Sequence, residues 1–188
     1  FPLFVDGNNS VTSGAENTFN SGSHLVSESG SEDYTSVISG DCDPQTGSVT
    51  LVTGTTKSCT ITNNDIAPKL TLNKIVVNDN GGTAPESAWT LSATGPTTIT
   101  GPGTAGSADV VSDATFDAGS YVLSESTGPA GYTASSWSCS NQENDGTISV
   151  GLGEDITCTI TNNDIAPKLT LVKTVINDNG GTKVVADF

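Results

Sequence analysis

The sequence predicts an all-β protein made of tandem β-sandwich domains, and three observations support this prediction. Short segments rich in β-branched and aromatic residues alternate with clusters of Gly, Pro, Asn and Asp, a pattern typical of strands joined by turns. No stretch has the 3.6-residue apolar period of an α-helix, so we expect no helix. One sequence of fourteen residues occurs twice, and a chain of 188 residues has room for two domains of about 100 residues.

Five segments are the clearest strands of the predicted sandwich. Each is short and is bounded by residues that favour turns. The dipeptides Asn80-Gly81 and Asn179-Gly180 predict tight turns, because both central positions of such a turn accept positive φ. The five segments are LTLNKIVV at 70–77, WTLSA at 89–93, YVLSES at 121–126, TISVGL at 147–152 and ITCTITN at 156–162.

The repeat predicts how the domains are arranged. The sequence CTITNNDIAPKLTL begins at Cys59 and again at Cys158, 99 positions later. In this register Phe188 aligns with Trp89, and the sequence expected after Phe188 is found at Phe1. We therefore predict three parts: a sandwich at residues 1–66 that lacks its first strand, a complete sandwich at 67–166, and the leading strand of a next domain at 167–188.

This register predicts head-to-tail association of the protein with itself. The open edge of an incomplete sandwich needs a strand to cover it. Either one very long polypeptide continues the repeat, or separate subunits each lend a strand to a neighbour. Because the chain contains no methionine, we expect Phe1 to follow other residues in a longer or processed protein.

Composition argues against several functions. The net charge is −15 and Arg is absent, so a nucleic-acid partner is not expected. No apolar run is long enough to insert into a membrane. His24 is the only histidine, and the Gly-rich segment Thr94–Gly106 lacks the lysine and helix of a phosphate loop. We therefore expect no enzyme activity.

The four cysteines fall two to each domain. Their spacing resembles no zinc or redox motif, and we expect disulfides Cys42–Cys59 and Cys139–Cys158, with free thiols as the alternative. A disulfide contributes about 2–4 kcal/mol to the stability of a small domain. Disulfides also imply an oxidising compartment, so we expect an extracellular location at the cell surface.

Three polar side chains of each domain fall on apolar strand faces. Side chains alternate across a strand, which puts Lys74 on the face of Leu70 and Leu72. By the same alternation a Glu and an Asn point inward from two other strands. A buried charge without a partner is costly, so we expect the three groups to meet. The two sets are Lys74, Glu125 and Asn162, and Lys173, Glu28 and Asn63.

A meeting of these groups would permit a specific reaction. Desolvation lowers the pKa of a lysine and raises that of a carboxylic acid. A neutral amine could then attack the Asn carboxamide while the glutamic acid polarises the carbonyl, leaving an isopeptide bond and ammonia. A plain buried ion pair, or a lysine that extends to the surface, is the alternative.

The order of these motifs resembles the collagen-adhesin B-type domain. A Lys in the opening strand is followed by Y-x-L-x-E ending at Glu125, by PAGY at 129–132 and by I-x-N ending at Asn162. The resemblance implies a prealbumin-like, Ig-like sandwich of the kind found in Gram-positive adhesins and pilins. It also implies an autocatalytic Lys74–Asn162 bond aided by Glu125, and a bond from Lys173 to the Asn63 of the next copy aided by Glu28. The neighbouring Asn163 and Asn64 are alternative acceptors.

The joint TNNDIAPKL at 62–70 and 161–169 resembles the cadherin interdomain linker. There, linker oxygens help to bind calcium. We expect these Asn and Asp residues to serve turn chemistry without a metal or other cofactor, and structural calcium is the alternative. The candidate ligands are Asn64, Asp65, Asp79, Asn163, Asp164 and Asp178.

These observations favour a structural subunit of an extracellular fibre or stalk. The alternative is an adhesin module that binds carbohydrate or a host protein through its loops. Trp137 is then the candidate to stack on a sugar, because Ser39 and its neighbours offer no aromatic counterpart. Trp89 aligns with Phe188, so we expect Trp89 to serve the core or an interface.

Overall fold

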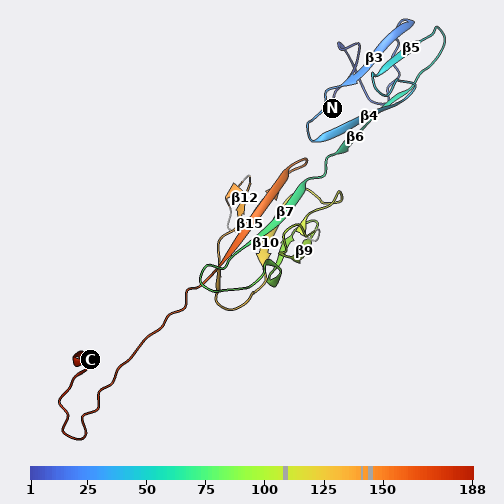
Figure 1. Ribbon diagram of the computed structural model, residues 1–188. Helices are drawn as coiled ribbons and strands as arrows, with labels where there is room; N and C mark the ends of the chain where they lie inside the picture. Colours follow the sequence, from blue (N-terminus) through green and yellow to red (C-terminus); the bar gives the residue numbers. More distant parts are fainter. Residues whose placement is uncertain (108–109, 141, 144–145) are drawn as a thin grey trace.

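The structure is a computed structural model that describes residues 1–107, 110–140, 142–143 and 146–188. It confirms the all-β fold: two β-units follow one another along the chain, and an extended C-terminal segment follows the second (Figure 1). The first unit holds β1 (Leu3–Val5), β2 (Asn9–Val11), β3 (Gly22–Glu28), β4 (Tyr34–Gly40), β5 (Ser48–Leu51) and β6 (Cys59–Asp65).

The second unit begins with β7 (Lys69–Val77), directly after the joint that carries Pro68. The turn after β7 contains Gly81, whose φ of +96° is accessible to glycine at little cost. The remaining strands are β8 (Thr90–Thr94), β9 (Ile99–Pro102), β10 (Gly119–Glu125), β11 (Tyr132–Ala134), β12 (Ser138–Cys139), β13 (Gln142–Glu143), β14 (Thr147–Val150) and β15 (Asp155–Asp164).

One sheet is built in the same way in both units. Its order is β2-β1-β3-β5 in the first unit and β9-β8-β10-β14 in the second, and the neighbouring strands in both are antiparallel. The cross-strand register also agrees, because Leu3 lies opposite Glu28 as Leu91 lies opposite Glu125. The two units are therefore structural repeats as well as sequence repeats.

The other sheet differs between the units. In the second unit β15 pairs with β11 and β12 on one side and with β7 on the other. The β7–β15 pairing is parallel and runs from Lys69 opposite Asp155 to Val77 opposite Asn163. In the described part of the first unit β6 pairs with β4 alone. Among the described residues of the first unit, no strand lies beside β6 in the place that β7 has beside β15.

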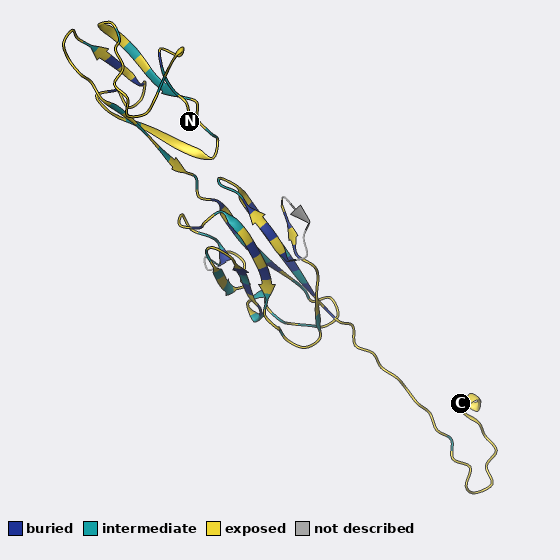
Figure 2. Ribbon diagram, turned by 180° about the vertical axis from the view of Figure 1, so that it is seen from behind, coloured by how far each residue is buried: buried dark blue, intermediate teal, exposed yellow. Residues whose placement is uncertain are grey.

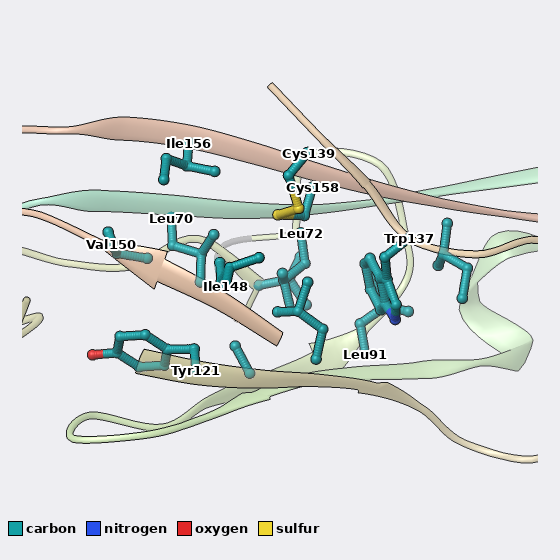
Figure 3. Close-up of a cluster of buried hydrophobic side chains, with 14 of the residues drawn as sticks. Leu70, Leu72, Leu91, Tyr121, Trp137, Cys139, Ile148, Val150, Ile156 and Cys158 are labelled. Carbon is teal, nitrogen blue, oxygen red and sulfur yellow. A yellow bond between two sulfur atoms is a disulfide. The ribbon is translucent and has the colours of Figure 1, made fainter. Parts of the chain in front are cut away.

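The main core lies between the two sheets of the second unit (Figure 3). Alternating residues of β7, β10, β14 and β15 fill it, because successive side chains of a strand point to opposite faces. In the first unit the buried apolar residues of the described structure are Val5, Cys42 and Val49. Figure 2 shows this contrast as a dark interior in the second unit and a largely exposed first unit.

The C-terminal segment, residues 165–188, contains no strand in this structure. Most of its apolar side chains are exposed, Leu169 at 84% and Leu171 at 86%, and most of the ribbon is yellow there in Figure 2. A single 3-10 turn, η3 (Val185–Asp187), occurs near its end, as η1 (Glu86–Ala88) occurs after β7. The sequence did not predict these turns, which are too short to have an apolar period.

Candidate functional site

The site is assembled from strands β7, β10 and β15 of the second unit. Lys74 follows Leu70 and Leu72 on the inward face of β7 and is only 2% exposed. In the parallel register Lys74 lies opposite Ile160, and Asn162 is the next inward residue along β15. Glu125 ends β10 on the facing sheet. Strand alternation thus brings together the three residues of the first predicted set.

Glu125 contacts both partners, one with each carboxylate oxygen. Lys74 Nζ lies 2.7 Å from Oε1, and Asn162 Nδ2 donates a hydrogen bond of 3.0 Å to Oε2. The Lys74 contact is a close, buried ion pair. Within the described part of the chain, the buried carbonyl oxygen of Asn162 has no hydrogen-bond partner. The site therefore holds an amine paired with a carboxylate, next to a buried carboxamide whose carbonyl oxygen accepts no hydrogen bond from the described residues.

Aromatic and glycine residues shelter the amine from water. Lys74 Nζ lies 4.8 Å from the centre of the Trp89 ring, and the Trp89 ring meets Tyr132 edge-on at 5.3 Å. A Cβ at Gly103 would lie 2.8 Å from the Cβ of Lys74, so only glycine leaves room for the lysine stem. A side chain at Gly128 would collide with the Trp89 ring. The sequence analysis missed both glycines, because close backbone approach leaves no local pattern.

Burial sets the protonation of the amine. Removal from water lowers the pKa of Lys74 below its ordinary value, and the opposing effect of the Glu125 carboxylate does not cancel this. The neutral amine is the form that attacks a carbonyl. The observed contact of the carboxylate is with Nδ2 of Asn162, the leaving nitrogen, rather than with the carbonyl that we expected it to polarise.

The arrangement fits amide exchange between Lys74 and Asn162. A bond from Lys74 Nζ to the Asn162 Cγ would form and the Cγ–Nδ2 bond would break. One proton would pass from Nζ to Nδ2 by way of the Glu125 carboxyl, and Nδ2 would leave as ammonia. Atoms and electrons balance without an oxidant, a metal or another reactant.

The second predicted set is only partly assembled. Asn63 Nδ2 donates a hydrogen bond of 2.9 Å to Glu28 Oε2, as in the second unit. Glu28 Oε1 is buried and, in the described structure, has no hydrogen-bond partner. Lys173 lies in the C-terminal segment, with its Nζ 3.7 Å from the centre of the Phe188 ring. One chain therefore brings together two of these three residues.

The alternative acceptors face away from the site. Asn163 and Asn64 are exposed, while Asn162 is buried and Asn63 is half-buried. Each exposed Asn follows its inward neighbour directly, so the alternation of strands β15 and β6 turns it outward. The geometry favours Asn162 and Asn63 as the acceptors.

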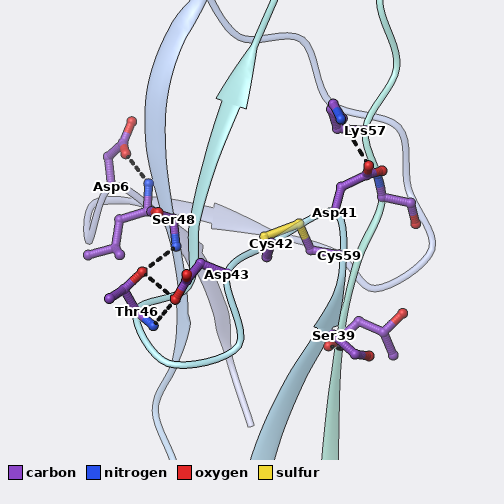
Figure 4. The surroundings of a disulfide bond; sticks show 12 residues. Asp6, Ser39, Asp41, Cys42, Asp43, Thr46, Ser48, Lys57 and Cys59 are labelled. Carbon is purple, nitrogen blue, oxygen red and sulfur yellow. Dashed lines mark hydrogen bonds and ion pairs between the residues drawn. A yellow bond between two sulfur atoms is a disulfide. The ribbon is translucent and has the colours of Figure 1, made fainter.

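Both predicted disulfides are present. The Cα atoms of Cys42 and Cys59 are 5.3 Å apart, and those of Cys139 and Cys158 are 4.0 Å apart. The second bridge lies in the core of the second unit (Figure 3). Figure 4 shows the first bridge beside an ion pair of 3.0 Å between Lys57 and Asp41. Each bridge ties the last strand of its unit to the preceding chain.

The acidic residues proposed for calcium form a loop cap instead. The Asp164 carboxylate accepts hydrogen bonds from the backbone N–H groups of Asp79, Asn80 and Gly82, at 3.1, 2.9 and 2.7 Å. Burial alone would raise the pKa of Asp164, but these donors outweigh it and the pKa lies below its ordinary value. Tyr132 completes the cap by donating from its hydroxyl to Asn78.

The remaining calcium candidates do not join this loop. Asn64, Asp65 and Asn163 are exposed, and Asp178 lies in the C-terminal segment. Within the described residues there is no group of three or more His, Cys, Asp or Glu side chains placed to hold a metal. The observed contacts are those of turn chemistry, with calcium as the alternative in the sequence analysis.

A backbone joint connects the two units. The N–H of Ile66 donates to the carbonyl of Asp33, and the carbonyl of Ile66 accepts from the N–H of Gly153, at 2.9 Å in each case. Ile66 therefore bonds to both units. Ile165 repeats the first of these contacts with Gly131, at 2.8 Å. The sequence signal that could have indicated this joint is the repeat itself, in which Ile66 recurs as Ile165.

Trp137, the candidate for stacking on a sugar, is not at the surface. Trp137 is 8% exposed and packs in the core beside Leu72 and Leu91 (Figure 3), so its ring face is closed to a ligand. Trp89 is buried, as its alignment with Phe188 predicted.

The fold and the site together define a disulfide-bonded β-sandwich with a buried Lys–Glu–Asn set at the edge of its core. In agreement, residues 65–160 match the family described as the SpaA-type prealbumin-like fold domain. The chain belongs to this family, whose domains are structural or adhesive and occur in surface proteins. No curated protein and no solved structure matched the chain. In the described part of the chain, no helix has the length and apolarity to cross a membrane.

Proposed function

We propose that this chain is a structural repeat of an extracellular fibre or stalk, and that an amide bond between Lys74 and Asn162 hardens its complete domain. The observation that carries the proposal is the burial of Lys74 against Glu125, whose other carboxylate oxygen accepts a hydrogen bond from Asn162. Stability alone does not explain a lysine in the core. A protein with a buried ion pair is often no more stable than one with apolar side chains of similar size in the same place.

The position of the bond suits a mechanical role. Strand β7 enters the domain and β15 leaves it, and the two run parallel as neighbours. A bond between Lys74 and Asn162 would join the entering strand to the leaving strand. Tension along the chain would then pass through covalent bonds and leave the rest of the sandwich unloaded. This is the property that a fibre repeat needs.

Other features support an extracellular fibre that assembles with itself. Both disulfides suit an oxidising environment. The Ile66 joint ties successive units through backbone hydrogen bonds, and the same half-joint recurs at Ile165. The net charge of −15 favours solubility of the monomer over non-specific aggregation. The partner that we propose is therefore another copy of the chain, in head-to-tail contact.

The intact mass of the reduced, denatured monomer tests the bond. We expect a mass short of the sequence mass by one ammonia, and a tryptic peptide pair joined between Lys74 and Asn162. Asn162→Ala should restore the missing mass, whereas Asn163→Ala, at the exposed neighbour, should leave it missing. A monomer with the full sequence mass, and no joined peptide pair, would remove the covalent part of the proposal.

Electron microscopy of the native material tests the fibre. We expect threads with an axial repeat set by the domain. If a protein with a verified Lys74–Asn162 bond gives only isolated particles at every protein concentration, the fibre part of the proposal is wrong. The amide bond would then stand without a filament.

A further inference from the structure

The hairpin of strands β1 and β2 presents an asparagine, a serine and an aromatic ring on one outer face of the first unit. We propose that Asn8 bears an N-linked oligosaccharide, and that its first sugar packs on the ring of Phe4. The proposal rests on the extracellular location given under the proposed function, because sugars of this kind are attached to secreted proteins. It does not depend on the bond between Lys74 and Asn162.

The sequence of the hairpin contains the acceptor pattern for such a sugar. Residues 8–10 read Asn-Asn-Ser, which is N-x-S with a middle residue other than proline. The pattern N-x-S or N-x-T occurs at no other asparagine of the 188-residue sequence. A pattern of three residues also arises by chance, so its surroundings in the fold decide whether it can be used.

Both residues of the pattern that a transferase must reach are accessible. Asn8 lies in the turn between β1 and β2, Ser10 lies in β2, and both are exposed. Among the described residues, neither side chain takes part in a hydrogen bond, an ion pair or a ring contact. Attachment of a sugar would therefore disturb no contact of the folded protein.

The turn is held in shape by a residue other than the acceptor. Asp6 and Gly7 have φ values of +53° and +71°, which turn the chain from β1 into β2. The Asp6 carboxylate accepts a hydrogen bond of 2.9 Å from the N–H of Leu25 and lies 2.8 Å from the ring nitrogen of His24. These contacts fix the turn to β3, and Asn8 takes no part in them.

Phe4 points away from the core of the first unit. It lies in β1 between Leu3 and Val5, and Val5 is buried. Leu3 occupies the register position of Leu91, which is 0% exposed in the second unit. Because successive side chains of a strand alternate between its faces, Phe4 lies on the outer face of the sheet.

Ser10 and Asn8 share this outer face. Ser10 lies directly opposite Phe4 in the antiparallel register, and residues opposite one another lie on the same face. Asn8 comes two positions before Ser10, so alternation puts it on the same side. Asn9 lies opposite the buried Val5 and faces the other way. The acceptor, its serine and the ring therefore form one patch.

The ring gives the first sugar a surface on which to pack. Phe4 is only partly buried, although it points away from the core. A sugar ring has an apolar face of C–H groups, and an aromatic side chain offers a large apolar area to such a face. A sugar linked to Asn8 would lie next to this area and would cover it.

The second unit lacks both features together. The residue in the register position of Phe4 is Ser92, which lies opposite Ser124 as Phe4 lies opposite Ser27. The turn after β8 reads Gly-Pro-Thr at 95–97 and contains no asparagine. The two sheets otherwise have the same strand order. The ring and the acceptor therefore differ together between the repeats, which supports a joint role.

A sugar at this position would protect an edge strand. Among the described strands, β2 pairs with β1 alone and ends the order of its sheet. An exposed edge can pair with the edge of another chain and lead to aggregation. A bulky, hydrated oligosaccharide at the start of β2 would obstruct this pairing.

The attachment needs an activated sugar as its second substrate. A lipid-linked oligosaccharide diphosphate of the cell supplies it, and a transferase of the cell catalyses the step. A bond from Asn8 Nδ2 to C1 of the first sugar forms, and the bond from C1 to the diphosphate oxygen breaks. Nδ2 loses one proton, and the lipid diphosphate leaves with the electron pair. No oxidation or reduction takes place.

Peptide mass analysis of the protein from its own cells tests the attachment. Chymotrypsin cleaves after Phe4 and Phe19, so residues 5–19 are released as one peptide. We expect this peptide to be heavier than its sequence by the mass of an oligosaccharide, and fragmentation to place the sugar on Asn8. A peptide with the bare sequence mass would overturn the proposal. A Lys74–Asn162 bond in the same sample would leave the proposed function standing.

Four variants made in the same cells identify the acceptor. Asn8→Gln and Ser10→Ala should each give the bare peptide. Asn9→Gln, at the neighbour that faces the other way, and Ser10→Thr, which keeps the hydroxyl, should both retain the sugar. A sugar that persists in Asn8→Gln would be linked to another residue and would overturn the assignment.

The packing on Phe4 has its own test. Thermal unfolding of the first unit should occur at a higher temperature with the sugar than in Asn8→Gln. In the Phe4→Ser background, which carries the residue of the second unit, this difference should disappear while the sugar remains attached. An equal difference in the two backgrounds would overturn the role of the ring.

Discussion

Strand β7 and the C-terminal segment have nearly the same sequence and different structures. Residues 69–77 form a nine-residue strand with Lys74 and Leu72 each 2% exposed. Residues 168–176 form no strand, and Leu171 is 86% exposed. The difference is the partner, since β7 lies beside β15 and the C-terminal segment has no neighbouring strand in one chain. Strand formation here depends on pairing and burial more than on local preference.

The loops that follow these two segments behave in the opposite way. Both form the same Asn side-chain bond to a carbonyl six residues on, and both end in a 3-10 turn. These contacts lie within a few residues of one another, so the local sequence suffices to form them. The comparison therefore separates structure that is encoded locally from structure that needs a second strand.

The largest expected effect is at the carboxylate that pairs with the lysine. Glu125→Ala leaves the Lys74 ammonium buried without a partner, which typically costs about 3–5 kcal/mol in the free energy of unfolding. It should also prevent the amide bond. Glu28→Ala is the matched control and should cost the monomer less, because no lysine occupies that site in one chain. Urea unfolding measures both, and equal losses would contradict the difference between the two units.

Leucine truncation compares the two copies of the strand directly. Leu72→Ala removes a core side chain and should cost about 2–5 kcal/mol. Leu171→Ala is the same change at an exposed position, and in the monomer it should stay within about 0.5 kcal/mol of the unchanged chain. Unfolding should be measured on a monomeric sample. A large loss from Leu171→Ala there would mean that the C-terminal segment packs against its own chain.

The disulfides test whether the stability of the first unit depends on its bridge as much as the stability of the second unit does. Replacing both cysteines of a pair with Ser should cost about 2–4 kcal/mol. The bridges span similar separations, 17 and 19 residues, so loop closure alone predicts similar losses. Thermal unfolding of the Cys42/Cys59 and Cys139/Cys158 double variants measures this. A much larger loss in the first unit would show that its bridge compensates for the missing strand.

The smallest expected effect is a pH dependence confined to the first unit. The hydrogen bond that His24 donates to the Asp6 carboxylate, and then the one that it donates to the Asn20 carbonyl, raise the pKa of His24 above its ordinary 6.5. The Leu25 N–H and then His24 lower the pKa of Asp6 below its ordinary 3.8. Stabilisation by His24 is complete below pH 6.5 and is lost as the pH rises through the raised value. Stabilisation by Asp6 is lost as the pH falls through its lowered value.

His24→Tyr tests this dependence, because Tyr121 stands at the equivalent position in the second unit. The free energy of unfolding of the first unit should fall as the pH is raised above neutrality in the unchanged chain and should stay level in the variant. The pair is exposed, so the change should be small. An identical pH profile for the two proteins would exclude a contribution from this pair.

Strand alternation was sufficient to predict most of the site. Counting by twos put Lys74, Glu125 and Asn162 on inward faces, and in the structure Glu125 contacts both of the others. Cysteine spacing gave both disulfides. The domain boundaries remain predictions, as does calcium binding by the exposed residues Asn64, Asp65 and Asn163. Alternation alone could not choose between Asn162 and Asn163, because a shift of one residue reverses the faces of a strand.

The surroundings of two candidate residues depend on distant segments. The role of Asp164 is decided by a loop more than 80 positions earlier in the chain, whose N–H groups occupy its oxygens. Trp137 was expected at the surface, but the sheet opposite it closes over the ring. Nothing close to either residue in the sequence indicates these neighbours.

The sequence by itself determined the repeat, the direction in which each strand residue faces, the cysteine pairs and the shape of the NDNGG loops. These features follow from covalent geometry and from contacts between nearby residues. Only the tertiary structure decided that β7 lies parallel to β15, which oxygen of Glu125 holds Lys74, and that the matching oxygen of Glu28 is left without a partner. The reason is physical: a buried charge or a strand edge is satisfied only by a group that folding, or a second chain, brings to it.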